Sequence, residues 1–166
     1  MNKISAIWRT ELWHPLSVHF PIAFLILSTV LGVLIFIFGK RYNLETRLKF
    51  TMSLLLWSGT LLLWLAFYTG KLAYSVEVRR ICDPFVLKNH LYWANVTSFI
   101  FSAATITDVL QKIVAIRIKK WLMLVTVILM VAGSAFLGYT GHLGASLVYE
   151  QGAGVHQPAS DCSDYK

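Results

Sequence analysis

Two histidines occupy matching places in a sparse internal repeat. His19 aligns with His90 at an offset of 71 residues, and the Tyr-Thr-Gly-x-Leu motif at Tyr68 aligns with the one at Tyr139. The histidine precedes the tyrosine by 49 residues in both halves. If each half is a helical hairpin, an axis along the membrane normal relates the hairpins and brings the two imidazoles face to face. Two opposed imidazoles in a four-helix bundle form a ligand pair; chance similarity in an apolar chain is the alternative.

Further polar residues are expected at the same end of the bundle as this pair. Ionisable residues at membrane depth are costly and usually face the bundle interior. Several histidines at one end therefore indicate a cofactor site, although each one alone fits an ordinary interfacial residue. We expect an outer ring that orients an imidazole or binds carboxylates of the cofactor. Its members would be His14, His142, Lys71, Arg79 and Arg80, with a spare ligand as the alternative role of His14. Lipid phosphates are the alternative partners of the basic residues.

The cofactor that best suits such a pair is b-type haem. Haem needs axial nitrogen donors, a flat apolar slot and partners for its propionates. We expect one haem b near the outer face, with His19 and His90 as the axial ligands of its iron. Zinc or copper fits less well, because the apolar segments show no HxxxH helix face and no convergent carboxylates. Arrangements for hydrolysis are absent as well, so no catalytic residues are expected.

The composition places these residues in a membrane protein. The chain of 166 residues is 57% hydrophobic and 14% charged, whereas a soluble domain carries about 25% charged residues. Four apolar segments reach the roughly 20 residues that a helix needs to cross a bilayer. They are Leu16–Phe38, Phe50–Thr69, Leu91–Leu110 and Trp121–Thr140. We therefore expect an all-α polytopic membrane protein, a four-transmembrane-helix bundle built from two tandem helical hairpins.

Three regions are expected along the chain. Residues 1–13 combine apolar residues at helical spacing with charges on the other face, which is typical of an interfacial amphipathic segment. Residues 14–149 form the four-helix transmembrane domain, in which Asp83 and Pro84 start the third helix early and place His90 one turn inside. Residues 150–166 form a polar C-terminal tail. No cleavable signal peptide is visible, so the first helix itself must direct insertion.

The loops predict an orientation. The short loops at residues 39–49 and 111–120 carry four Lys or Arg residues each, which is typical of the cytoplasmic side. The other side carries nearly as many cations over a greater length, so the bias is modest. It predicts a multi-pass protein of the bacterial inner membrane with both termini periplasmic. Cys82 and Cys162 fall on the outer side, where a disulfide is permitted; two unpaired thiols are the alternative.

Two motifs carry a family resemblance. Residues 14–23, HPLSVHFPIA, resemble the opening motif of the bacterial transmembrane family called domain of unknown function 2231. Residues 141–155, GHLGASLVYEQGAGV, resemble its closing motif, although Ala145 stands where a second glycine usually follows Gly144. The resemblance implies a four-helix membrane protein from a family with no settled activity. Its members are sometimes joined to electron-transfer domains, which favours a redox role by analogy.

These observations predict a membrane-embedded electron-transfer subunit rather than an enzyme in its own right. The expected partners are the lipid bilayer, subunits of a membrane redox complex or a periplasmic cytochrome, and quinol, but no nucleic acid. One alternative is a non-haem structural or assembly subunit of a respiratory membrane complex. Another is a copper- or zinc-handling protein on the periplasmic side. The sequence leaves open the redox partner, the potential, the haem number and the oligomeric state.

Overall fold

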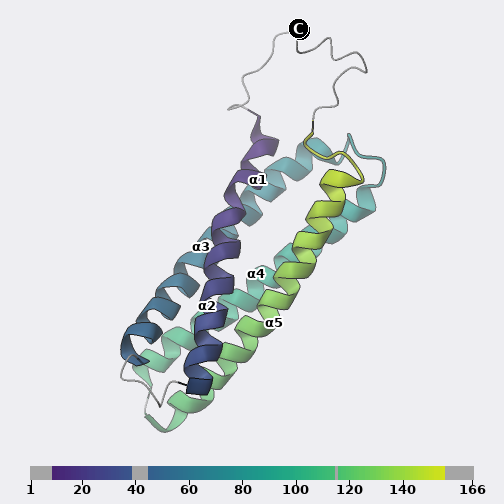
Figure 1. Ribbon diagram of the computed structural model, residues 1–166. Coiled ribbons are helices and arrows are strands. Elements are labelled where there is room, and N and C mark those ends of the chain that lie inside the picture. The colour runs from purple at the N-terminus through teal and green to yellow at the C-terminus, as the bar shows by residue number, and fades with distance from the viewer. Residues whose placement is uncertain (1–8, 39–44, 115, 156–166) are drawn as a thin grey trace.

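The computed structural model describes residues 9–38, 45–114 and 116–155, and this part of the chain is all-helical, as expected (Figure 1). A 3-10 helix, η2 (Thr10–Leu12), leads into the short helix α1 (Trp13–Ser17). Four long helices follow: α2 (His19–Phe38), α3 (Glu45–Glu77), α4 (Pro84–Ile113) and α5 (Ile116–Tyr149). The chain stays helical through the junction of α1 and α2, where the N–H of Val18 donates to the carbonyl of His14 at 3.2 Å.

The start of α4 follows from its sequence. Asp83 has an extended backbone and its carboxylate accepts the N–H of Phe85 at 2.9 Å, while Pro84 occupies the first helical position. An acidic N-cap followed by proline is a strong start signal, because the cap satisfies one N–H and proline has none to satisfy. The early start expected for this helix is confirmed, and it places His90 in the second turn of α4.

The long helices form two antiparallel hairpins that lie side by side. Helix α2 packs mainly on α3 and α4 mainly on α5, while α3 with α4 and α2 with α5 close the bundle (Figure 1). Each long helix contributes at least one fully buried side chain to the common core, among them Leu25, Leu56, Phe101 and Met130. The start of α1, the start of α4 and the end of α5 therefore meet at one end of the bundle, which we call the histidine end.

Three of the described helical stretches are long and apolar enough to cross a membrane: Thr10–Phe38, Thr46–Glu77 and Ile118–Tyr149. Large apolar side chains such as Leu16, Leu61 and Trp121 are exposed along them, as expected of surfaces that face lipid. Helix α4 was expected as a fourth span, but it does not reach the same apolarity. The expectation of four spans is thus confirmed for three helices by length and composition.

The polarity of α4 has a structural reason. Its hydroxyl groups are used inside the bundle: Thr105 pairs with Thr60 at 2.9 Å, Ser102 accepts the indole N–H of Trp64 at 2.9 Å, and Thr107 pairs with Thr126 at 2.9 Å. In an apolar medium, a polar side chain is tolerated when another helix satisfies it. The low mean hydropathy of α4 therefore reflects polar groups that are hydrogen-bonded inside the bundle rather than exposed to lipid.

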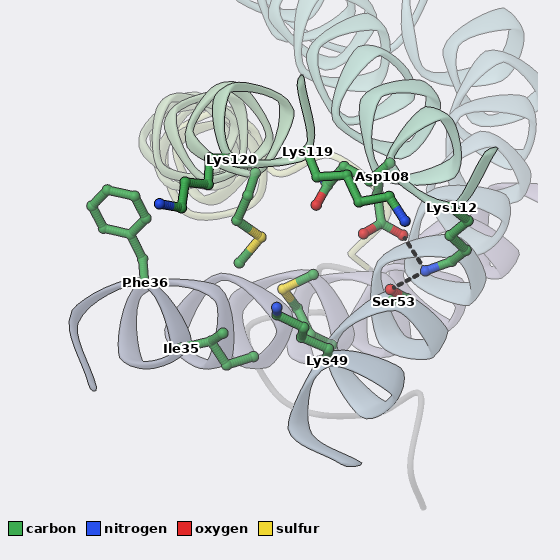
Figure 2. A pocket seen from close by; sticks show the side chains of 11 residues that line it. Ile35, Phe36, Lys49, Ser53, Asp108, Lys112, Lys119 and Lys120 are labelled. Atoms are coloured by element: carbon green, nitrogen blue, oxygen red, sulfur yellow. Dashed lines mark hydrogen bonds and ion pairs between the residues drawn. The ribbon is translucent and has the colours of Figure 1, made fainter. Parts of the chain in front are cut away.

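The opposite end of the bundle holds a buried carboxylate. Asp108 accepts the indole N–H of Trp57 at 2.9 Å and lies 3.4 Å from the ammonium of Lys112 (Figure 2). Only 2% of Asp108 is exposed, so the two donors are what make its burial tolerable. We call this end the lysine end.

Candidate cofactor site between the hairpins

His14 is anchored to the second long helix. Helix α1 places its ring against α3, where Nδ1–H donates to the carbonyl oxygen of Ala66 at 2.9 Å. A carbonyl oxygen can only accept, so Nδ1 carries the proton and Nε2 keeps its lone pair. The ring also lies close to Gly70, where an added Cβ would stand 3.0 Å from its Cε1. His14 is thus held half-buried with one nitrogen left as a potential ligand.

His90 is anchored in the same way in the other hairpin. Its Nδ1–H donates to the carbonyl oxygen of Thr140 on α5 at 3.0 Å. A Cβ added at Gly144 would stand 3.2 Å from its Cε1. In both hairpins the glycine lies one helical turn beyond the residue whose carbonyl accepts the bond. The two histidines therefore have equivalent surroundings, the same tautomer and an Nε2 that is left to bind a ligand.

The two anchored rings meet across the bundle. Their centroids are 6.1 Å apart and their planes are inclined by 73°. One ring is carried by the first hairpin and the other by the second. The contact thus joins the two halves of the molecule at the histidine end.

The partner of His90 is therefore His14, whereas the repeat alignment predicted His19. His14 and His19 are five positions apart, and at about 100° per residue they lie on different faces of nearly continuous helix. His19 is exposed, although its side chain still lines the edge of the cavity described below. The alignment at an offset of 71 residues missed this pairing. The paired histidines, and the residues that anchor each of them in its hairpin, are separated by slightly more than 71 residues.

A cavity of about 510 Å³ surrounds the histidine pair. All of the long helices and α1 contribute to its walls, which are mainly apolar. Several wall residues are small, which leaves space between the backbones: Ala66, Gly70, Ala73, Ala94, Gly144 and Ala145. Cavities of roughly 300–1,000 Å³ with apolar walls and a few polar groups are typical of ligand and cofactor sites.

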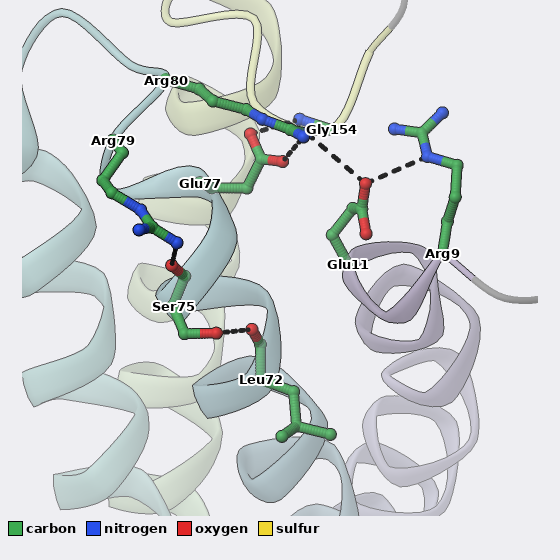
Figure 3. A network of polar contacts seen from close by, with 8 residues as sticks. All are labelled: Arg9, Glu11, Leu72, Ser75, Glu77, Arg79, Arg80 and Gly154. Atoms are coloured by element: carbon green, nitrogen blue, oxygen red, sulfur yellow. Dashed lines mark hydrogen bonds and ion pairs between the residues drawn. The ribbon is translucent and has the colours of Figure 1, made fainter. Parts of the chain in front are cut away.

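A polar network lies at the outer edge of this cavity (Figure 3). Glu11 accepts Nε–H of Arg9 at 3.0 Å and lies 3.5 Å from Nη1 of Arg80. Arg80 also lies 3.3 Å from Glu77, whose second oxygen accepts the N–H of Gly154 at 3.1 Å. The network ties together the segment before α1, the end of α3 and the turn after α5.

The turn after α5 depends on glycine. Gly152 and Gly154 have φ values of 68° and 72°, a region that other residues rarely adopt. The same turn includes a hydrogen bond of 2.9 Å from the N–H of Ala153 to the carbonyl of Leu147. Gly152 and Gly154 thus fold the chain back toward Glu77, which accepts the N–H of Gly154.

The expected outer ring is assembled only in part. Arg80 is exposed and does not line the cavity itself, but it contacts Glu11 and Glu77, which do. Lys71, Arg79 and His142 are exposed and do not line the cavity, and the guanidinium of Arg79 donates to the carbonyl of Ser75 at 3.3 Å. Sequence reasoning missed Glu11 and Glu77, because single acids near helix ends carry no periodic signal.

The cysteines and the two ends of the chain were also the subject of predictions. Cys82 is exposed and forms no bond with another described cysteine. Cys162 and residues 156–166 of the tail lie outside the described residues, as do residues 1–8 of the N-terminal segment. The disulfide therefore stays a prediction.

Comparison with known proteins identifies a family. A family model described as "Predicted membrane protein (DUF2231)" matches residues 12–157, which confirms the family resemblance inferred from the sequence. No curated protein and no solved structure matches the chain.

Proposed function

Since the chain belongs to DUF2231, a family of predicted membrane proteins, we propose that it is a membrane-embedded electron-transfer subunit that binds one b-type haem through His14 and His90. In this proposal α4 crosses the bilayer with the three more apolar helices. Both termini lie on the periplasmic side of a bacterial inner membrane, as the basic loops predict. The site then lies close to the periplasmic surface, within reach of an external electron carrier.

The observation that carries the proposal is the geometry of the histidine pair. The two ring centroids lie 6.1 Å apart, with one ring on each hairpin. Nε2 of His14 and Nε2 of His90 would hold the iron of a haem bound in this cavity. Each Nδ1–H is bonded to a backbone carbonyl, the arrangement that fixes ring orientation in metal-ligating histidines.

The number of donors favours haem over a simple ion. Structural zinc takes four protein ligands and catalytic zinc takes three. Among the described residues, no group of three or more His, Cys, Asp or Glu side chains could hold such an ion. In a b-type haem the macrocycle supplies the equatorial donors, so two axial imidazoles are sufficient. The pair thus fits haem better than the copper- or zinc-handling alternative.

The cavity also fits the chemistry of haem. Its volume of about 510 Å³ and its apolar walls suit a large flat macrocycle. The glycines beside the rings leave room for the imidazoles to stand against α3 and α5. When bound, haem would supply a one-electron carrier. The chain's own residues hold the imidazoles in one tautomer and shape the edge through which electrons would enter or leave.

The remaining predicted residues take outer positions in this proposal. His19 lies at the exposed edge of the cavity, where it is placed to meet a propionate or an electron-transfer partner. Arg80 is the cation best placed to pair with a propionate, in exchange for one of its two carboxylate partners. Quinol and a periplasmic cytochrome stay the proposed classes of redox partner.

The proposal is tested by the haem content of the purified protein. Protein expressed with added haem precursor and purified in mild detergent should show a Soret band, a reduced b-type spectrum and about one haem per chain. Protein that is folded but colourless would overturn the proposal and leave the role of a non-haem structural or assembly subunit.

A further inference from the structure

We propose that the lysine end of the bundle binds the phosphate group of an anionic phospholipid. A second cavity of about 610 Å³ lies there, far from the histidine pair, between residues of α2, α3, α4 and α5 (Figure 2). This site does not depend on the haem proposal, because the two cavities share no lining residue.

The charge of this cavity selects an anion. Four lysines from three helices line it: Lys49, Lys112, Lys119 and Lys120. Asp108 is the single acid among the lining residues. Like charges around one cavity raise its positive potential and attract a counter-anion. Basic pockets between membrane helices are suited to the phosphate groups of anionic lipids.

Part of the cavity is rigidly organised. The ammonium of Lys112 lies 3.4 Å from Asp108, donates to Oγ of Ser53 at 3.0 Å and stands 5.1 Å from the ring centroid of Trp57. The charges of Lys112 and Asp108 therefore largely neutralise each other, and their contacts hold both side chains in place on the cavity wall. Lys119 and Lys120, at the start of α5, complete the basic part of the lining, and the side chain of Lys120 extends toward Phe36 (Figure 2).

The apolar part of the lining distinguishes a lipid from a soluble anion. Ile35 and Phe36 of α2 stand beside Met52 and Met123 on the cavity wall. Phe36 is 53% exposed, and it lies next to Lys120 in Figure 2. A ligand held by the lysines thus has an apolar surface beside it that faces the bilayer. A phospholipid matches both parts, whereas inorganic phosphate matches only the lysines.

The experiment measures lipid binding to the full chain by native mass spectrometry in a neutral detergent. Phosphatidylglycerol should bind the wild-type protein more tightly than phosphatidylcholine, which has the same chains and no net charge. Lys119→Gln and Lys120→Gln should each weaken phosphatidylglycerol binding by about fivefold, the effect expected of one basic residue near an anionic lipid. Circular dichroism of each variant verifies that the helices are retained.

Two matched variants serve as controls. Arg47→Gln removes an exposed cation from the lysine end outside the cavity lining, and Lys88→Gln removes an exposed cation from the histidine end. Both should bind phosphatidylglycerol like the wild type. Equal binding of the two lipids, or equal losses in all four variants, would overturn the proposal. Displacement of the lipid by an equal concentration of inorganic phosphate would instead identify a soluble-anion site and would also overturn it.

Discussion

The paired imidazoles differ from the other described histidines in how they are held. His14 and His90 each donate to one backbone carbonyl and stand against one glycine, whereas His19 and His142 are exposed. A histidine that is only interfacial has no need of a fixed tautomer or of a glycine beside its ring. The repeated anchoring is therefore the strongest sign that these two side chains share a task.

Gly144→Ala tests this anchoring. Its Cβ would lie 3.2 Å from Cε1 of His90, so the ring must move by a few tenths of an ångström, which disturbs its hydrogen bond to the carbonyl of Thr140. Changes around a metal-binding histidine typically weaken the metal site by roughly tenfold or more. We expect a comparable loss in haem affinity, measured by haem titration followed at the Soret band.

Gly138→Ala is the matched control, because it lies on the same helix and a Cβ added there meets nothing within 4 Å. Its haem affinity should equal that of the wild type. Equal haem affinities in Gly144→Ala and Gly138→Ala would show that the glycine beside His90 does not position the ring.

The sequence analysis predicted that histidines meet at this end of the bundle, but it did not predict that His14 is the one in contact with His90. The convergence of His14, His19 and His90 at one end could be predicted, because helix order and length fix which ends meet. The contact of His14, rather than His19, with His90 could not be predicted. It depends on the rotation of α1 about its axis and on the ring orientation set by Ala66, and an alignment of the two repeats contains no information on either.

At the scale of the helices, close approach between α4 and α5 depends on Gly133. A Cβ added there would lie 3.0 Å from the ring of Phe101, which is completely buried. An aromatic ring in a packed core has no free direction in which to move. Extra volume in such a core typically costs about 1–3 kcal/mol.

Gly133→Ala should therefore lower the free energy of unfolding by about 1–3 kcal/mol, which a thermal melt in detergent would detect as a lower Tm. Gly138→Ala again supplies the control, since alanine there should leave Tm unchanged or raise it slightly. A Gly133→Ala protein as stable as this control would contradict the account of the interface.

Three of the four long helices, α3, α4 and α5, extend beyond their predicted bounds at both ends, whereas α2 begins at His19 rather than at Leu16. Hydropathy located Phe50–Thr69, but α3 runs from Glu45 to Glu77, because a helix continues into the polar interface beyond its apolar part. The early start at Asp83 was predictable because capping is a local signal. The break between α1 and α2 at Val18 also has a local signal, because Pro21 has no N–H to donate to the carbonyl of Ser17, four residues earlier. The sequence analysis did not use this signal.

The whole molecule is a bundle with a different polar site at each end. At the histidine end two imidazoles meet in a largely apolar cavity, and at the lysine end four lysines and one buried carboxylate line a second cavity. The all-helical class and the two-hairpin arrangement follow from the apolar segments and short loops. The prediction overestimated the apolarity of α4. Its hydroxyl groups form hydrogen bonds with neighbouring helices, and the sequence alone does not reveal these contacts.

The central claim is that His14 and His90 together hold one haem, and a set of four single variants tests it most directly. His14→Gly and His90→Gly should each lose the low-spin spectrum, because each removes one axial donor. His19→Gly and His142→Gly should keep it. Added imidazole should restore the spectrum of the first two variants, which separates the loss of a ligand from a failure to fold. A low-spin spectrum that survives in His14→Gly but disappears in His19→Gly would contradict the account and return the ligand role to His19.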